Sequence, residues 1–213
     1  MSGFGDNRSD LPQQLDAAMG ERVRKLIAAA KQGDRAAFGQ IVLLHQDRLY
    51  NAVYRLVSDR DDAQDIVQDT FLKALEHLPG FSGKSSLYTW LFRIAYNVAV
   101  SRLRRQQVRG DVSLETTLGL GGDSQAASLI SRMSAAVDAP PAATLRAEQA
   151  QLVQGALSRL EFDHRTVLVL RDIDGLDYLQ ISEILDLPIG TVKSRINRAR
   201  AALRVELKGL LDV

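Results

Sequence analysis

The sequence predicts an all-α fold made of two small helical domains joined by a flexible linker. The first observation is that apolar residues recur at helical spacing across residues 23–105, where no strand pattern is present. The second is a further helical pattern across residues 145–204. The third is the stretch between them, which loses this periodicity and is rich in Gly, Ser, Ala and Pro, a composition typical of linkers.

These patterns divide the chain into four parts. Residues 1–22 are predicted to be a polar, disordered amino-terminal tail. The first domain is predicted to cover residues 23–107, the flexible linker residues 108–144, and the second domain residues 145–213. Within the linker, residues 126–136 have a weak helical pattern.

The composition excludes several classes of site. None of the 213 residues is a cysteine, which excludes disulfides, thiolate metal sites and thiol catalysis. The three histidines, His45, His77 and His164, lack metal-ligand spacing, so neither a metal nor another cofactor is expected. No apolar run has the length of a signal peptide or a membrane span. A cytoplasmic protein without membrane insertion is therefore expected.

The first domain is predicted to begin with a short helix over residues 23–31, which Gly33 and Asp34 end. A long amphipathic helix follows over residues 35–57. The third helix, over residues 63–78, comes after a turn whose acidic residues suit a helix start. Its predicted core positions are Ile66, Val67, Phe71, Leu72 and Leu75.

This third helix is also predicted to carry a polar face. Asp65, Gln68 and Asp69 are three and four residues apart, so a helix places them on one side. Such a face is usually only solvated, and the alternative is a docking surface for a basic partner. Lys73, four residues after Asp69, is the one basic residue expected to reach it.

The loop over residues 79–86 contains the sequence Gly-Lys-Ser, which occurs in phosphate-binding loops. However, the loop follows a predicted helix rather than a strand, and the upstream glycine of the nucleotide-binding pattern is missing. A nucleotide-binding loop is therefore rejected. One proline and two glycines restrict the shape of this loop.

The helix predicted over residues 87–105 carries Trp90, Arg93, Asn97 and Arg104 on one face. An aromatic ring, guanidinium groups and an amide can stack on an unpaired base, hold phosphates and read a base edge. The alternative interpretation is that Trp90 packs in the core and that Arg93 only extends its charged end into solvent.

The second domain is predicted to end in a helix-turn-helix over residues 176–204. The turn contains Pro188 and Gly190, so the first helix ends before it and Thr191 can open the second one. The core-facing stripe of the second helix is predicted to consist of Val192, Ile196, Ala199 and Leu203. The opposite face is basic and no acid interrupts it, which suits DNA phosphates and base edges. A merely solvated basic face is the alternative.

Three motifs give the chain a resemblance to a bacterial protein family. They are DIVQDTF at residues 65–71, FSGKS and TWLFRIA within residues 81–97, and GTVKSR and RAR within residues 190–200. Together they resemble the extracytoplasmic-function group of RNA polymerase sigma factors, over both domains but not over the tail and the linker. The resemblance implies a sigma-2 domain, a sigma-4 domain, and a transcription initiation factor that is not an enzyme. The partners it implies are core RNA polymerase (β and β′ subunits), promoter DNA and an anti-sigma factor.

The resemblance also implies roles for particular residues. Asp65, Gln68 and Asp69 match the helix that docks on a coiled coil of the largest polymerase subunit. The loop over residues 81–86 and Asn97 match the site that captures an unpaired base of the −10 promoter element. With the basic and aromatic helix face, the residues expected at the −10 element are Phe81, Ser82, Lys84, Ser85, Trp90, Arg93, Asn97 and Arg104. The residues expected at the −35 element are Thr191, Lys193, Ser194, Arg195, Asn197 and Arg198.

The chain departs from the family pattern at three positions. Ser101 stands where the family often has an acid, which leaves the promoter preference open. Ser182 and Asp186 replace the commoner Ala and Gly of the helix-turn-helix. Because aspartate tolerates a left-handed backbone better than most residues, the turn is expected to form. The linker resembles the segment that passes through polymerase toward the RNA exit path.

Two other functions compete with this interpretation. A transcription activator or response-regulator output domain would share the helix-turn-helix, but it would not need the acidic face or the basic and aromatic helix. A site-specific recombinase would need a nucleophile and an arginine cluster on a catalytic domain, usually a mixed α/β one. The absence of a strand pattern before residue 106 disfavours the recombinase.

Overall fold

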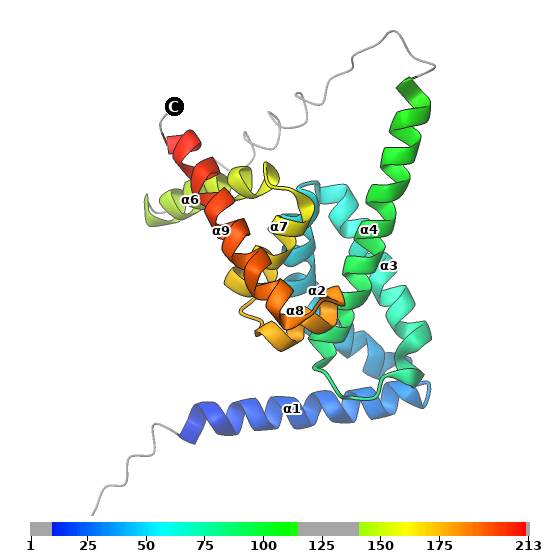
Figure 1. The fold of residues 1–213 in the computed structure, drawn as a ribbon. Helices are drawn as coiled ribbons and strands as arrows, with labels where there is room; N and C mark the ends of the chain where they lie inside the picture. The colour runs from blue at the N-terminus through cyan, green and yellow to red at the C-terminus, as the bar shows by residue number, and fades with distance from the viewer. Residues whose placement is uncertain (1–9, 115–140, 212–213) are drawn as a thin grey trace, which may run out of the picture.

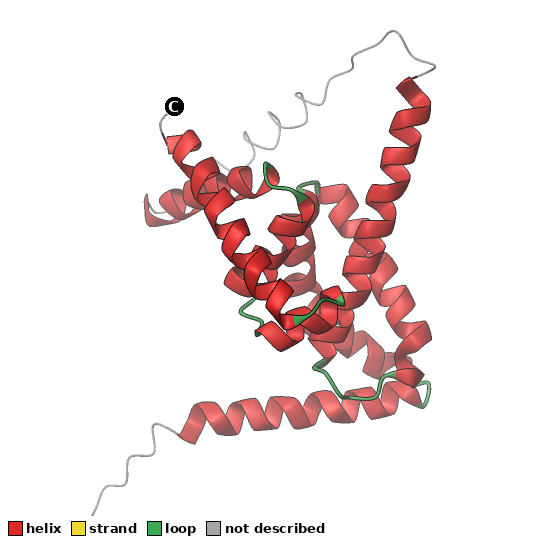
Figure 2. Ribbon diagram, in the orientation of Figure 1, coloured by secondary structure: helices red, strands yellow, loops and turns green. Residues whose placement is uncertain are grey.

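Figure 1 shows the computed structural model, which describes the backbone of residues 10–114 and 141–211 and the side chains of residues 20–105 and 149–210. The secondary structure of these residues consists of α-, 3-10 and π-helices, and the described residues include no strand (Figure 2). The all-α prediction is therefore confirmed. None of the described helices is long and apolar enough to span a membrane.

The first domain is a helical bundle. Its elements are α1 (Asp10–Lys31), α2 (Arg35–Val57), α3 (Arg60–His77), the 3-10 turn η1 (Leu78–Gly80) and α4 (Leu87–Leu114). Helices α2, α3 and α4 pack on one another, while α1 packs on α2 and η1 and then extends away from the bundle (Figure 1). The core of this bundle includes the fully buried side chains of Ile41, Leu49, Ile66, Leu91 and Phe92. Burial of each such side chain contributes about 1.5–3 kcal/mol.

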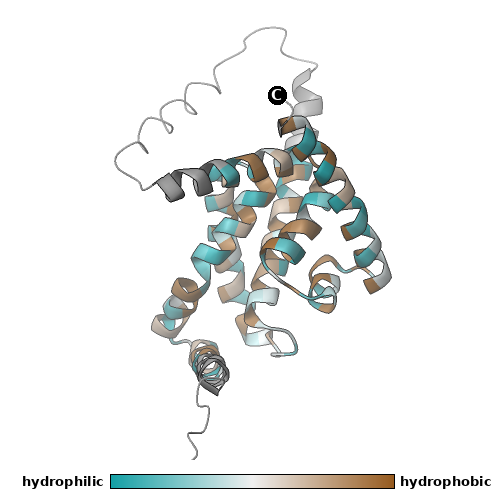
Figure 3. Cartoon of the chain, turned by 90° about the vertical axis from the view of Figure 1, so that its left-hand side faces the viewer, coloured by the Kyte–Doolittle hydropathy of each residue, from teal (hydrophilic) through white to brown (hydrophobic). Residues whose placement is uncertain are grey.

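The second domain is also a helical bundle, and its buried side chains continue the hydrophobic core of the first. Its elements are α6 (Pro141–Ser158), α7 (Phe162–Leu168), the π-helical turn η2 (Val169–Ile173), α8 (Tyr178–Leu185) and α9 (Ile189–Leu211). Helix α9 packs on α6, α7 and α8. The side chains buried most completely here include Leu157, Leu168, Leu170, Ile181 and Ile184. Hydrophobic and hydrophilic residues alternate along the coloured parts of the helices in Figure 3, as in amphipathic helices.

Short polar side chains set the starts of α2 and α3. The Asp34 carboxylate accepts hydrogen bonds from the backbone N–H groups of Ala36 at 2.8 Å and Ala37 at 3.1 Å. Asp59 accepts one from the N–H of Asp62 at 2.8 Å. Each carboxylate thus caps donors that the first helical turn leaves unpaired, which contributes about 1 kcal/mol per cap.

Several helix boundaries differ from the sequence prediction. Helix α1 begins at Asp10, so residues 10–22, which the sequence assigned to a tail, are helical. Helix α4 continues to Leu114 and α6 begins at Pro141, because proline suits the first turn of a helix. The weak helix predicted over residues 126–136 lies outside the described residues.

Some predicted core positions are wrong. Leu72 and Leu75 on α3 are 56% and 42% exposed, since they lie on the side of the helix that also carries Asp65 and Asp69. Helical spacing alone could not assign these side chains, because an apolar residue at the edge of a stripe fits either side.

The two domains pack directly against each other. Helix α4 contacts α8, and α2 contacts α6, α7 and η2. The Gln154 amide donates a hydrogen bond to the Ser58 hydroxyl at 3.2 Å, and the rings of Tyr96 and Phe162 stack with their centroids 6.0 Å apart. The sequence pattern predicted two domains on a linker and did not predict this interface.

His45 makes the stability of this structure depend on pH. Burial, and to a lesser extent the charge of Arg48, lowers the pKa of His45, and its Nε2 atom is buried without a hydrogen-bond partner among the described residues. The folded protein resists protonation of His45, whereas the unfolded chain accepts it. The contribution of neutral His45 to the free energy of unfolding is therefore present above about pH 6.5 and is lost as the pH falls further.

We therefore expect the free energy of unfolding to decrease less in a His45→Phe variant than in the parent between about pH 7.5 and about pH 5.5. Urea unfolding at the two pH values measures this difference. His77→Gln at an exposed position of α3 is the control and should follow the parent. Equal pH dependence of parent and His45→Phe would contradict the assignment.

Candidate nucleic-acid interface

The acidic face of α3 is present, but an arginine from another helix bridges it. The Arg102 guanidinium on α4 lies 3.2 Å from Asp62, 3.2 Å from Asp65 and 3.7 Å from Asp69. Lys73, the partner predicted from helical spacing, makes no ion pair within the described residues, so that expectation was wrong. Periodicity within one helix could not reveal Arg102, because it lies 37 residues from Asp65.

The face nevertheless keeps much of its acidic surface. The side chains of Asp65 and Asp69 are 59% and 47% exposed beside Arg102, and Gln68 is exposed next to them. Three carboxylates around one guanidinium leave net negative charge on this side of α3. A basic partner could therefore approach it without any rearrangement of the bundle.

The loop between η1 and α4 is held at both ends. The Lys31 ammonium donates a hydrogen bond to the Phe81 carbonyl at 2.5 Å, and the Phe81 N–H donates one to the Leu78 carbonyl at 3.0 Å. Ser86 caps α4, because its hydroxyl accepts a hydrogen bond from the Thr89 N–H at 3.0 Å. These contacts fix where the loop begins and where α4 starts.

This loop and α4 enclose a cleft of about 420 Å³. Six of the eight residues predicted for the −10 element line it: Phe81, Ser82, Lys84, Ser85, Trp90 and Arg93. The rings of Phe81 and Trp90 lie 5.1 Å apart at 46°, on a wall that also carries two cationic side chains. Aromatic surface for stacking and cations for phosphates therefore meet in one place.

The other two predicted residues lie farther along α4. Asn97 and Arg104 are exposed, and neither lines the cleft. Trp90 is half-buried against the core, as one interpretation of the sequence predicted, yet it still lines the cleft. The sequence did not indicate that Glu183 of α8 and Asp186, the residue that follows α8, line the same cleft.

The turn of the helix-turn-helix is formed as predicted around Asp186. This residue has φ 53° and ψ 48°, the left-handed conformation that aspartate tolerates. The Ser182 hydroxyl donates to the Leu187 carbonyl at 2.5 Å, so a serine at this position closes the turn. Helix α9 begins at Ile189, which places Thr191 in its first turn rather than at its cap.

The basic face of α9 is partly neutralised by neighbouring helices. Arg195 forms an ion pair with Asp163 of α7 at 2.8 Å, and Arg200 is held by Asp172 of η2 through two hydrogen bonds of 3.0 and 2.5 Å. Hydrogen bonding to Asp172 raises the pKa of Arg200. Lys193 lies 5.5 Å from the Tyr178 ring centroid. The remaining predicted −35 residues that are exposed are Ser194, Asn197 and Arg198.

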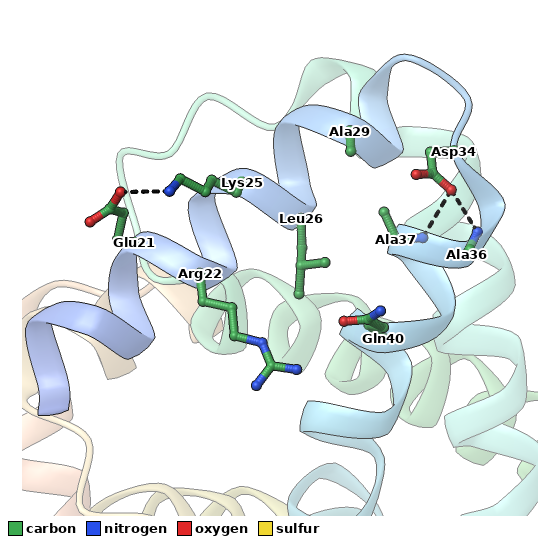
Figure 4. Close-up of a pocket in the computed structure, with 9 residues that line it drawn as sticks. All are labelled: Glu21, Arg22, Lys25, Leu26, Ala29, Asp34, Ala36, Ala37 and Gln40. Atoms are coloured by element: carbon green, nitrogen blue, oxygen red, sulfur yellow. Dashed lines mark hydrogen bonds and ion pairs between the residues drawn. The ribbon is translucent and has the colours of Figure 1, made fainter.

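A second cleft, of about 590 Å³, lies between α1 and α2 (Figure 4). Three of its four charged residues already serve the fold: Glu21 pairs with Lys25 at 2.9 Å, and Asp34 caps α2. None of the residues predicted to contact DNA or a partner lines it. We therefore do not assign the functional site to this cleft.

Comparison with known proteins matches both domains of the chain to one family. Sigma-70 region 2 matches residues 41–109, and sigma-70 region 4 matches residues 150–203. The ECF RNA polymerase sigma factor SigW of Bacillus subtilis is 34% identical over 188 residues, covering 88% of this chain and 98% of the relative. The chain belongs to the extracytoplasmic-function sigma factors. This sigma factor is an alternative one that directs RNA polymerase to promoters.

Other relatives extend over nearly the whole sigma factor. The sigma-H factor of Pseudomonas aeruginosa is 36% identical and covers 90% of this chain and 96% of its own. Among solved structures, RpoE of Bartonella quintana in complex with the anti-sigma factor NepR has a TM-score of 0.61 at 29% identity, covering 80% and 96% of the two chains. CnrH in complex with the cytosolic domain of CnrY has a TM-score of 0.60 at 29% identity, covering 90% and 97%.

Proposed function

We propose that this sigma factor docks on core RNA polymerase through Asp65, Gln68 and Asp69 of α3. The support is the exposed acidic surface that remains around Arg102, together with the family to which the chain belongs. The chemistry of RNA synthesis stays with polymerase, and this chain needs no cofactor of its own. Since polymerase and chromosome share the cytoplasm of bacteria, the proposal places the protein there.

The cleft between the loop over residues 81–86 and α4 is proposed to take unpaired bases of the −10 element. One observation carries this part: six predicted residues from the loop and the helix converge on a single cleft with an aromatic wall. Removing a base from the stack costs a few kcal/mol, which stacking and polar contacts in such a cleft can offset. Asn97 and Arg104, farther along α4, would contact the strand outside it.

The exposed face of α9 is proposed to bind the −35 element as duplex DNA. Lys193, Asn197 and Arg198 lie on a helix whose other side packs in the core, which is the arrangement of a recognition helix. Most of the affinity would come from phosphates, with a few contacts to base edges. An anti-sigma factor is a further proposed partner. The RpoE structure described above is a complex with the anti-sigma factor NepR, and the CnrH structure is a complex with the cytosolic domain of CnrY.

The test of this function is transcription by core polymerase with this chain. Trp90→Ala should remove about 1–3 kcal/mol of stacking, so it should impair opening of a duplex promoter more than use of a promoter already mismatched over the −10 element. Asn97→Ala should act in the same direction with a smaller effect, because Asn97 lies outside the cleft. Permanganate footprinting of unpaired thymines measures opening.

Tyr50→Phe, on α2 away from the cleft, is the control and should open the promoter like the parent. If Trp90→Ala and the parent open the duplex equally, the cleft does not capture a base. If Trp90→Ala fails to associate with core polymerase while the parent associates, the loss of opening reflects docking and not the cleft.

A further inference from the structure

A buried polar cluster joins the two domains at Asp174, the residue that follows η2. The side chain of Asp174 is 8% exposed and accepts a hydrogen bond from the Tyr88 hydroxyl on α4. The Arg48 guanidinium on α2 donates to the Asp174 carbonyl oxygen at 2.9 Å and lies 3.8 Å from the Tyr88 ring centroid. Burial raises the pKa of Tyr88, so its hydroxyl keeps the proton that it donates. One residue of the second domain is thus held by two helices of the first.

A second polar contact joins the domains at the carboxyl end of α2. Arg165 of α7 donates a hydrogen bond to the Leu56 carbonyl and further ones to the Ser158 carbonyl at 2.8 Å and the Leu160 carbonyl at 2.9 Å. A cation at a helix carboxyl end satisfies carbonyl groups that the helix leaves unpaired and interacts favourably with its dipole. The domains are therefore joined by directional contacts as well as by apolar packing.

This interface places α8 over the cleft of the first domain. Glu183 and Asp186 line the cleft together with Lys84, Trp90 and Arg93, and α8 packs against α4 in Figure 1. Both acidic side chains are exposed within this arrangement. Phosphates of a DNA strand that approached the two cations would meet these carboxylates, and like charges repel.

We propose that the structure is an autoinhibited state, in which α8 of the second domain covers the −10 cleft of the first. The proposal rests on the function proposed above for that cleft. A single strand can enter only after the Asp174 cluster breaks and α8 moves away. Because both domains belong to one chain, a contact that is weak between separate molecules can hold the closed state, at an effective concentration on the order of mM.

The closed state can be tested through Trp90, the only tryptophan of the chain. The variants Asp174→Asn and Arg48→Ala weaken the cluster without touching the cleft. The matched control is Asp47→Asn, which removes the same charge at an exposed position of α2, outside the cleft. Acrylamide quenching of Trp90 reports its exposure, and fluorescence anisotropy of a labelled single-stranded DNA pool of random sequence reports binding.

In both cluster variants, quenching of Trp90 is expected to increase, and the DNA pool is expected to bind about tenfold more tightly. A tenfold gain in affinity is expected when the open, binding-competent state rises from about one tenth of the molecules to all of them. Asp47→Asn should match the parent in both measurements. Unchanged quenching and affinity in Asp174→Asn and in Arg48→Ala would overturn the proposal. Increased quenching without tighter binding would also overturn it, and would place the fault in the function assigned to the cleft.

A covalent lock tests the same state from the opposite direction. The chain has no cysteine, so Ser58→Cys with Gln154→Cys, two residues in contact across the interface, can be joined by a cleavable bismaleimide. The linked protein should bind the DNA pool more weakly than the same protein after cleavage, while a labelled Ser58→Cys single variant should not change. Equal binding before and after cleavage would show that closure does not control the cleft.

Discussion

Reversing the charge of the acidic face with Asp65→Lys and Asp69→Lys is expected to abolish binding to core polymerase. The two lysines would place like charges opposite a basic surface, which costs several kcal/mol. The structure also predicts a cost in stability, because both aspartates bridge to Arg102 in the parent. Pull-down of core polymerase measures docking, and urea unfolding measures the free energy of unfolding.

Arg102→Gln is the matched control for this experiment. It removes the same bridges to Asp65 and Asp69 and should lower the free energy of unfolding by about 1 kcal/mol, as expected for a partly exposed network. It adds no positive charge to the face, so it should still bind core polymerase. If Arg102→Gln loses polymerase as completely as the double variant, the loss reflects the bundle and not the charge of the face. If the double variant binds like the parent, the docking surface lies elsewhere.

Lys193→Ala is expected to weaken binding to the −35 element by about 1–3 kcal/mol if a base contact is lost. If Lys193 contacts only a phosphate, the loss of affinity should be similar for all DNA sequences. The slope of the logarithm of the binding constant against the logarithm of the salt concentration should then decrease in magnitude by about one. Arg195→Ala should weaken DNA binding less, because Asp163 already holds this guanidinium at 2.8 Å. Filter binding to a duplex promoter fragment at several salt concentrations measures both variants.

Arg200→Ala is the control on the same helix. It removes an equal charge, but Asp172 already pairs with that charge through two hydrogen bonds. We expect it to bind the duplex nearly as well as the parent. Comparable losses in Lys193→Ala and Arg200→Ala would mean that α9 attracts DNA only through its net charge. No loss in either would remove α9 from the interface.

The two clusters of predicted DNA residues show what sequence patterns can and cannot resolve. Helical spacing placed Trp90 and Arg93 together, and both line the cleft. The same spacing grouped Asn97 and Arg104 with them, although these residues lie beyond it. A helix face runs the whole length of a helix, whereas a cleft ends where the neighbouring loop ends.

The sequence by itself determined the all-α fold, the amphipathic helices, the left-handed turn at Asp186 and the family. These features depend on residues close together in the chain, where helical periodicity and cap chemistry act. Only the tertiary structure decided that Arg102 bridges the acidic face, that Asp163 holds Arg195, and that Glu183 of α8 lines the same cleft as Lys84 and Trp90. The contacts between the two domains join residues as far apart as Arg48 and Asp174, which are separated by 126 positions, and no local pattern encodes which distant surfaces meet.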